Sequence, residues 1–394
     1  MPHIFIKDFD KKKFKDKIDS DEVSFHFIGK SLRWGENYSV LTSFRNIDMF
    51  LSIQKRDEKW LVKGDKNTRP SPNFPLHKAI ETFGKFTKSE ILFSNLNLKE
   101  SQHIPQNSKL KTPQFFEEDF WKVKKNRVQI EIGFGSGRHI LHRAKNEPDS
   151  FFIGVEIHKP SIEQVLKQIE IQGLKNIYLL DFDARLFLET LPSNSIDTIY
   201  VHFPVPWDKR PHRRVINPQF IVESKRVLKH LGILELRTDS ENYFQWSLDL
   251  FLKEEKLKME LLKNQQIDIT SKYEDRWIKL EKNIYNFRIT NLDKSDSLRL
   301  VEELPLFYHR KREDFSEIKN LIGTKILREN WFISFVDIFE ISETEFVFQI
   351  VGGSYNYPET RFLFTDSNKI EYLIRKPLEI EVNREIDKHL RELL

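Results

Sequence analysis

Between residues 111 and 295, short apolar segments alternate regularly with amphipathic ones. The apolar segments have the β-branched and aromatic content of strands, whereas the amphipathic ones have the period of a helix. The predicted strands are residues 128–134, 151–157, 176–182, 195–204, 233–239, 258–262 and 284–290. The predicted helices are residues 137–145, 160–173, 184–191, 217–232 and 240–255, the last with Ser240 as its N-cap. This order predicts an α/β fold with a doubly wound, mostly parallel, seven-stranded Rossmann-like sheet.

Segments rich in predicted β-strands flank this central region. Residues 1–110 contain short strand-like stretches, a break with three prolines at residues 67–75 and one short helix after it. Residues 296–394 return to strand-like patterning and end in a helical segment at residues 384–393. We therefore expect three parts: an N-terminal extension (1–110), a central domain (111–295) and a C-terminal extension (296–394). The extensions could be small nucleic-acid-binding barrels, packing modules or a dimer interface, so a homo-oligomer stays open.

Composition excludes several classes of protein. The chain has 394 residues and no cysteine, which excludes disulfides and thiolate metal sites. It has no run of 18 apolar residues, and its first residues lack the apolar core of a secretion signal. We expect a cytoplasmic protein with no membrane partner and no metal ion. The net charge of +4 is too small to indicate a nucleic-acid partner by itself. Basic residues gather at residues 208–214, 11–17 and 308–312, a pattern that is often only solvated surface.

A glycine-rich turn, EIGFGSG, follows the first central strand and precedes a helix. Gly133, Gly135 and Gly137 can take positive φ and let a ligand approach the backbone. A dinucleotide fingerprint, G-x-G-x-x-G, fails because its sixth position is Arg138. G-x-G-x-G with an acid two residues earlier, here Glu131, resembles the first motif of methyltransferases that use S-adenosylmethionine. A carboxylate there can hold the ammonium of that cofactor, directly or through water. The alternative is a glycine-rich turn without a ligand.

Two further acids follow the next strands. Glu156, at the tip of the second strand, can accept hydrogen bonds from ribose hydroxyls, although this also fits a nicotinamide cofactor. Asp183, after the third strand, could contact the adenine amino group. Asp181 is a rival for that role, and Asp183 could instead be a helix N-cap.

The loop after the fourth strand, residues 202–214 (HFPVPWDKRPHRR), is the predicted substrate site. Pro204 and Pro206 stiffen its first half, and Trp207 offers a face on which a base can stack. Arg213 and Arg214 are placed to reach phosphates. The alternative is a structural turn with Trp207 in the core.

In order and spacing, EIGFGSG, FIGVEIH, DFDA, FPVPWDKRPHRR and RTDSENY resemble motifs of the bacterial tRNA (guanine-N(7))-methyltransferase family. The resemblance covers about residues 111–290, less than half of the chain, and its most specific part is the FP-x-PW-x-K loop. It implies a class I S-adenosylmethionine-dependent methyltransferase domain that methylates N7 of a guanine in tRNA. It also implies that Glu131, Glu156 and Asp183 bind the cofactor.

The same resemblance implies substrate-binding residues. Lys209 matches the lysine of the family loop, and Asp239 matches the aspartate of its T-D motif. Ser271 to Glu274, SKYE, resembles a T-x-[FY]-E element with serine in place of threonine. A free surface lysine is the alternative for Lys209, and a residue that stabilises a helix dipole is the alternative for Asp239.

One position departs from the family pattern. The family loop usually reads FPDPW, but this chain has Val205 where the aspartate stands, so we assign no catalytic residue. Guanine N7 carries a lone pair and no proton, so alignment and desolvation can supply the rate without a general base. Orientation of the base could then fall to Asp239 or Glu274.

Three functions follow from these patterns. The first is a tRNA guanine methyltransferase. The second is a non-catalytic RNA-binding protein on a methyltransferase scaffold, for which Val205 is the only support in the sequence. The third is a nicotinamide-dependent oxidoreductase, which needs a hydride-handling site that we do not find.

Overall fold

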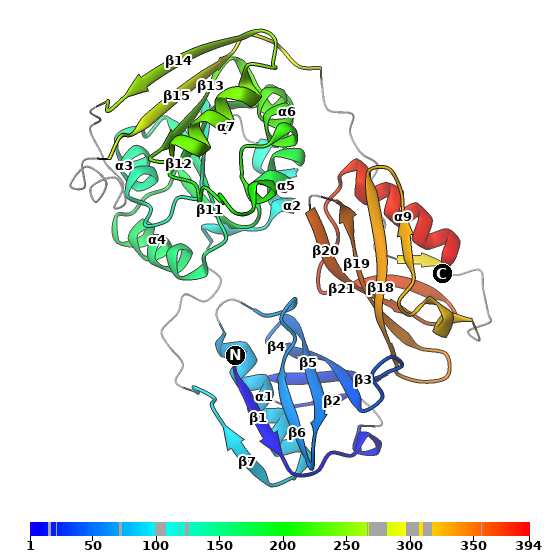
Figure 1. The fold of residues 1–394 in the computed structure, drawn as a ribbon. Helices are drawn as coiled ribbons and strands as arrows, with labels where there is room; N and C mark the ends of the chain where they lie inside the picture. Colours follow the sequence, from blue (N-terminus) through cyan, green and yellow to red (C-terminus); the bar gives the residue numbers. More distant parts are fainter. Residues whose placement is uncertain are drawn as a thin grey trace. The chain divides into compact units, whose positions relative to one another are not determined.

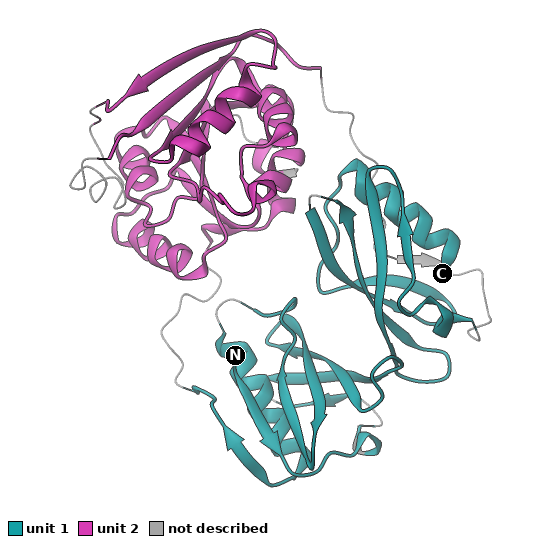
Figure 2. Cartoon of the chain, viewed as in Figure 1, with its two compact units in different colours: residues 1–103, 301–394 teal, residues 104–300 magenta. Residues whose placement is uncertain are grey.

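The chain forms two compact units in the computed structural model (Figure 2). The structure describes residues 1–14, 17–20, 22–70, 73–98, 108–117, 119–122, 126–265, 267, 282–296, 307–309, 317–355 and 357–394. Unit 1 contains residues 1–103 and 301–394, and unit 2 contains residues 104–300. The two flanking segments therefore belong to the same unit. No helix among the described residues combines the length and the apolar character that crossing a bilayer requires.

Unit 2 is built on an eight-stranded sheet. Its strands, in spatial order, are β14 (Leu257–Lys263), β15 (Tyr285–Asn291), β13 (Leu228–Thr238), β12 (Ile196–His202), β9 (Arg127–Ile132), β10 (Ser150–Glu156), β11 (Ile177–Asp181) and β8 (Leu110–Lys111). Pairing is parallel from β13 to β8 and antiparallel at β15, so the sheet is mixed. All seven predicted strands are present, and the two-residue β8 is the additional strand.

Helices cover both faces of this sheet (Figure 1). They are α2 (Pro113–Glu117), α3 (Arg138–Asn146), α4 (Lys159–Ile171), α5 (Ala184–Glu189), α6 (Pro218–Val227) and α7 (Glu241–Phe251), with short 3-10 turns at Asp119–Lys122 and Pro211–Arg213. One apolar core lies between the sheet and α2, α5, α6 and α7, and a second lies under α3 and α4. Ser240 caps α7 as expected, because its side chain accepts from the amide of Tyr243.

One helix prediction was wrong at its end. The pattern predicted a helix from residue 217 to 232, but α6 ends at Val227 and β13 begins at Leu228. Ile196 pairs with Leu228 and Thr198 pairs with Ile233, so residues 229–232 bulge out of the ladder. Sheet pairing therefore outweighs the helical period of this stretch.

The strand order places the glycine turn beside the predicted substrate loop. β9 is central, β10 and β11 lie on one side of it, and β12 and β13 lie on the other. After β11 the chain crosses to the other side of β9 to form β12. The point at which the strand order reverses therefore lies between the neighbouring strands β9 and β12. In open α/β sheets, ligands bind beyond the carboxyl ends of the strands at such a switch point.

Unit 1 is a thirteen-stranded sheet assembled from both ends of the chain. The N-terminal strands are β1 (His3–Ile6), β2 (Ile18–Asp19), β3 (Val23–Ser31), β4 (Asn37–Phe44), β5 (Ile47–Arg56), β6 (Lys59–Gly64) and β7 (Ile91–Ser94), with α1 (Phe74–Thr87) and a 3-10 turn at Lys11–Lys13. The C-terminal elements are β16 (Phe307–His309), β17 (Lys325–Leu327), β18 (Trp331–Glu340), β19 (Phe346–Ser354), β20 (Tyr357–Thr365), β21 (Lys369–Leu373) and α9 (Glu381–Leu393), with a 3-10 turn at Ile318–Leu321. Each half has its own apolar core, one around α1 and one around α9.

The two halves of unit 1 meet along a short seam. Antiparallel pairing of β3 with β18 joins Ser31 to Phe339. The Ser31 hydroxyl donates to the buried carboxylate of Asp337 at 2.7 Å. An apolar cluster that includes Phe50 and Phe362, whose ring centroids are 4.6 Å apart, closes the seam. Because β3 pairs with β18, the two flanks form one continuous sheet, although the paired residues are about 300 positions apart in the sequence.

Glu189, at the C-terminal end of α5, should make the stability of unit 2 change with pH. Burial, and secondarily the carboxylate of Glu223, raises the pKa of Glu189 to about 7, although Arg226 opposes the shift. The folded-state pKa exceeds the unfolded value of 4.5, so this group's contribution to stability is fully present below that value and is lost as the pH rises to about 7. In Glu189→Gln this titration is absent. The free energy of unfolding of Glu189→Gln relative to wild type should therefore rise by about 2–3 kcal/mol from about pH 5 to about pH 8.

Differential scanning calorimetry at the two pH values measures this difference. Glu170→Gln, at an exposed glutamate of α4, is the matched control and should track the wild type. A pH-independent effect of Glu189→Gln would show that burial does not perturb this carboxyl group.

Candidate functional site

The glycine turn after β9 has the backbone that its sequence predicts. Gly133, Gly135 and Gly137 have φ values of 70°, 50° and 72°, all in the left-handed region. A Cβ at Gly133 would meet nothing within 4 Å, and at Gly135 it would only just reach the carbonyl of Gly133. At Gly137 it would lie 2.3 Å from Val165 of α4. The first two glycines therefore leave open space above the turn, whereas Gly137 permits close packing of α3 against α4.

Glu156 ties the end of β10 to this turn. One carboxylate oxygen accepts from the amide of Gly135 at 3.0 Å. The other accepts from the amides of Ile157 and His158 at 2.8 and 2.9 Å. A carboxylate has about four acceptor sites, so about one remains for a further donor.

Glu131 is buried beneath the start of α3, with only 4% of its surface exposed. Its carboxylate lies 2.8 Å from Nδ1 of His139. The ring of His139 in turn packs against the rings of Tyr200 and His202, with centroids 4.8 and 4.7 Å away. Neither histidine was predicted as a site residue from the sequence. The available signal was that His202 alternates with Tyr200 on β12 and ends the strand before the substrate loop.

His202 has a second carboxylate partner. Its Nε2 lies 3.0 Å from Oε1 of Glu235, on the neighbouring strand β13. Burial lowers the pKa of His202, and the hydrogen bond with Glu235 only partly opposes this. The pKa of Glu235 is also lowered, because this bond and the charge of Arg288 outweigh its burial. At neutral pH we therefore assign a neutral His202 that donates from Nε2 to an ionised Glu235.

Glu131, His139 and His202 form a group of the kind that can bind a metal. Their possible ligand atoms lie within 4.8 Å of one another. Each of the three side chains already has a hydrogen-bond partner, which accounts for the grouping without an ion.

Asp183 is the N-cap of α5. Its carboxylate accepts from the amide of Arg185 and forms a salt bridge with the guanidinium of the same residue at 2.6 Å. Its rival Asp181 lies 3.8 Å from the ammonium of Lys159. The N-cap reading of Asp183 thus holds, and contact with an adenine remains a prediction.

The loop predicted to bind the substrate, residues 202–214, has a strained backbone. Phe203 and Trp207 both have positive φ, 50° and 46°. Such conformations cost non-glycine residues of order 1–3 kcal/mol each and persist only where the surroundings impose them. Trp207 is 37% exposed, so it does not lie in the core, and the guanidinium of Arg213 stacks over its ring at 5.1 Å.

Arg214 supports this loop from within. It is 5% exposed and donates from Nε to the carbonyl of Pro206 at 2.8 Å. Its guanidinium also pairs with Asp208 and packs over the ring of Trp246. These contacts fit a residue that braces the loop rather than one that reaches a phosphate.

The remaining predicted residues lie at the surface or outside the described residues. Lys209 is exposed, and Val205 is 59% exposed. Asp239 accepts from the ammonium of Lys282 at 3.1 Å. Ser271 and Glu274 lie outside the described residues.

The two kinds of glycine should respond differently to substitution. Gly137→Ala should lower the free energy of unfolding by about 2–4 kcal/mol, since the clash with Val165 adds to the unfavourable φ. Gly133→Ala should cost only about 1–2 kcal/mol, because φ is its sole penalty. Urea unfolding measures both. Adding Val165→Ala should recover part of the loss in Gly137→Ala, and equal losses for both glycines would contradict this division.

The chain is similar to several known proteins. Residues 125–287 match a family described as "Putative methyltransferase". The chain is 39% identical over 352 residues to a tRNA (guanine-N(7)-)-methyltransferase of Wolinella succinogenes, covering 88% of each chain. It is 37% identical to proteins of the same name from Campylobacter jejuni, over 98% of each chain, and from Helicobacter pylori, over 100% of this chain and 98% of the relative. These matches extend through both flanks, and the chain belongs to the tRNA (guanine-N(7)-)-methyltransferase family.

Proposed function

We propose that this protein transfers the methyl group of S-adenosylmethionine to N7 of a guanine in tRNA, in the cytoplasm. The observation that carries the proposal is the similarity to relatives named for this reaction, which are 39% and 37% identical over 88% and 98% of the chain. The glycine turn at the switch point of the sheet supports it. No observation on the described residues favours a non-catalytic protein or an oxidoreductase.

The residues at the turn fit the cofactor. The open space above Gly133 and Gly135 allows a ligand to lie against the backbone. Glu156 has acceptor capacity left for a ribose hydroxyl. Glu131 would hold the ammonium directly or through water, and Asp183 would face the adenine. When bound, S-adenosylmethionine supplies a methyl group on a positively charged sulfur.

The substrate side needs no proton transfer at the reacting atom. Guanine N7 has a lone pair and no proton, so the protein must position the base and exclude water rather than deprotonate it. Trp207 would stack on a base, and Lys209 and Arg213 would contact phosphates. Asp239, Ser271 and Glu274 are proposed from the family motifs to contact the tRNA.

The direct test is a methyl-transfer assay. Purified protein, labelled S-adenosylmethionine and unmodified tRNA should give labelled 7-methylguanosine after digestion to nucleosides. Absence of transfer to any tRNA, with the cofactor bound, would contradict the proposal.

Substitutions should separate the two binding functions. Glu156→Gln and Glu131→Gln should weaken cofactor binding roughly tenfold or more, since each loses a charge-assisted contact, and should leave the Kd for tRNA unchanged. Lys209→Ala should weaken tRNA binding and leave the Kd for the cofactor unchanged. It should also reduce the salt dependence of tRNA binding by about one released ion. Calorimetry with the cofactor and filter binding with tRNA measure the two affinities. Glu170→Gln and Lys167→Ala, exposed on α4, are matched controls.

Equal loss of both ligands in Glu156→Gln and Lys209→Ala would contradict this division of roles.

Val205→Asp restores the usual family residue at an exposed position of the loop. Because attack by N7 requires no general base, kcat should stay within about twofold of wild type. Single-turnover transfer measures this. A gain of tenfold or more would show that the valine limits the rate, and Val205→Asn is the uncharged control.

A further inference from the structure

Unit 1 contains a polar cavity that the methyl-transfer site does not use. The cavity has a volume of about 420 Å³. β4 and β5 line it on the N-terminal side of the seam, and β18, β19 and β20 line it on the C-terminal side. A volume of this size is typical of small-ligand sites, which span about 300–1,000 Å³.

The cavity is the polar continuation of the apolar seam. On β4, Leu41 belongs to the apolar cluster, and Ser39 and Asn37 follow on the same face of the strand. On β5, Ser52 pairs with Ser39 and Gln54 pairs with Asn37. Polar side chains cannot replace the apolar packing without hydrogen-bond partners. The facing surfaces are therefore built for a polar occupant where the seam ends.

Several side chains in the cavity have unused hydrogen-bonding capacity. Within the described part of the chain, the side chains of Asn37, Ser39 and Gln349 form no hydrogen bond. Gln349 lies on β19, paired with Asp337 on one neighbour and with Phe362 on the other. Carboxamides offer donors and acceptors side by side, which is the pattern that the edge of a nucleobase requires.

The rim of the cavity carries an aromatic face and two cations. Trp34 is 59% exposed, and the guanidinium of Arg33 lies 4.8 Å from its ring centroid. Arg33 donates to the carbonyl of Val336, and Arg56, which lines the cavity, donates to Oε1 of Gln54. Among the residues that the structure describes, neither arginine forms a salt bridge. The carboxylates of Asp65 and Asp337 also line the cavity, and the charge of Arg33 acts on Asp337. The two cations at the rim therefore balance the two carboxylates inside.

We propose that this cavity binds one unstacked nucleotide of the tRNA substrate. The base stacks on Trp34, Asn37 and Gln349 hydrogen-bond its edge, and Arg33 and Arg56 contact the flanking phosphates. Recognition of single-stranded RNA combines these three elements: an aromatic platform, amide groups at the base edge and cations along the backbone. This inference rests on the proposed function, since it assumes that tRNA is the substrate.

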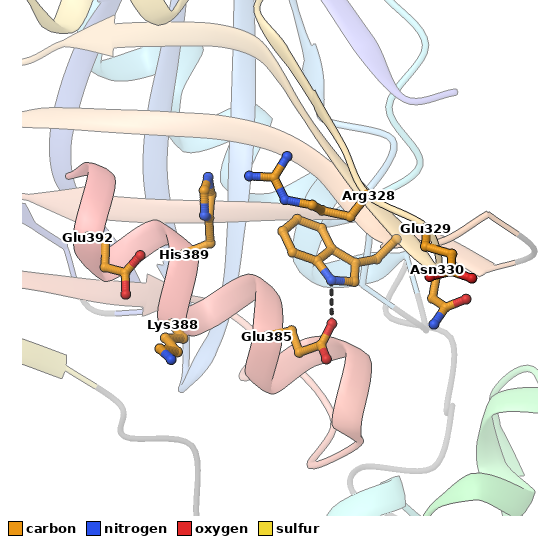
Figure 3. A pocket seen from close by; sticks show the side chains of 8 residues that line it. Arg328, Glu329, Asn330, Glu385, Lys388, His389 and Glu392 are labelled. Atoms are coloured by element: carbon orange, nitrogen blue, oxygen red, sulfur yellow. Dashed lines mark hydrogen bonds between the residues drawn. The ribbon is translucent and has the colours of Figure 1, made fainter.

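A second cavity of unit 1 lacks these properties. It measures about 450 Å³ and lies between α9 and the residues that precede β18 (Figure 3). The ring of Trp331 is only 5% exposed and its Nε1 donates to Glu385, so it offers no free face. Three carboxylates, from Glu329, Glu385 and Glu392, line this cavity beside the basic side chains of Arg328, Lys388 and His389, so its charge is mixed, and what it lacks is an exposed aromatic face.

The test compares tRNA binding and turnover in full-length variants. Trp34→Ala should raise both the Kd and the KM for unmodified tRNA about tenfold and leave kcat within twofold. Trp34→Phe should retain most of the affinity, because it keeps a stacking face. Gln349→Ala should weaken binding less than Trp34→Ala. Arg56→Ala should reduce the slope of log K against log salt by about 0.7, the contribution of one phosphate contact in a single strand.

A short mixed-sequence oligoribonucleotide separates this inference from the proposed function. It should quench the fluorescence of the wild type and bind Trp34→Ala about tenfold more weakly, whether or not methyl transfer occurs. Tyr355→Ala, at an exposed aromatic residue outside the cavity, is the matched control and should bind as the wild type does. Equal binding by the wild type and Trp34→Ala would overturn the inference. So would a loss of binding in Tyr355→Ala that exceeds the loss in Trp34→Ala.

Discussion

The hydrogen bond from the Gly135 amide to the Glu156 carboxylate links the turn after β9 to the end of β10. The rest of the candidate site is arranged around this contact. Because β9 and β10 are parallel neighbours, their carboxyl ends meet at one edge of the sheet. Three left-handed glycines then shape the turn, and only a residue without a Cβ adopts that conformation at low cost. The carboxylate of Glu156 thereby holds the backbone of the glycine turn and still has room to accept a hydrogen bond from a ligand.

A buried polar network supports this surface from below. Glu131 would be an isolated charge in a sheet, which is costly, but His139 lies within hydrogen-bond distance. A second hydrogen-bonded pair of a histidine and a carboxylate, His202 and Glu235, joins the next two strands, β12 and β13. The two imidazoles pack against each other, so a change of charge in one pair would be felt by the other. The carboxylate proposed to hold the cofactor is therefore positioned by side chains from both β12 and α3.

The alternation of apolar and amphipathic segments was sufficient to predict the order of strands and helices from β9 to β15, but not β8 and α2, which precede them. It was not sufficient for features decided by distant partners. β8 exists only because Leu110 and Lys111 pair with β11, and β13 begins at Leu228 because Ile196 pairs with it. The joining of the flanks depends on contacts such as Ser31 with Asp337, which no local pattern encodes.

In the candidate site, too, local motifs predicted only the residues whose partners lie nearby in the sequence. The motifs identified the acids and glycines near the turn, because short spacings encode them. They did not identify His139 and His202, whose partners come from other strands and a helix. Nor could they distinguish Arg213, which stacks on an exposed Trp207, from Arg214, which is buried beneath the loop.

The loop at the end of β12 offers a physical answer to the absence of the family aspartate at Val205. Strain at Phe203 and Trp207 is maintained by fixed contacts, among them the bond from the Phe203 amide to the Arg237 carbonyl. Arg214 holds the loop from the inside. If this loop contacts the guanine as proposed, these contacts would help it to keep its shape, and positioning of a nucleophile that needs no deprotonation depends on shape more than on charge. Under that proposal, the contacts of the loop would supply the alignment that a carboxylate otherwise helps to impose.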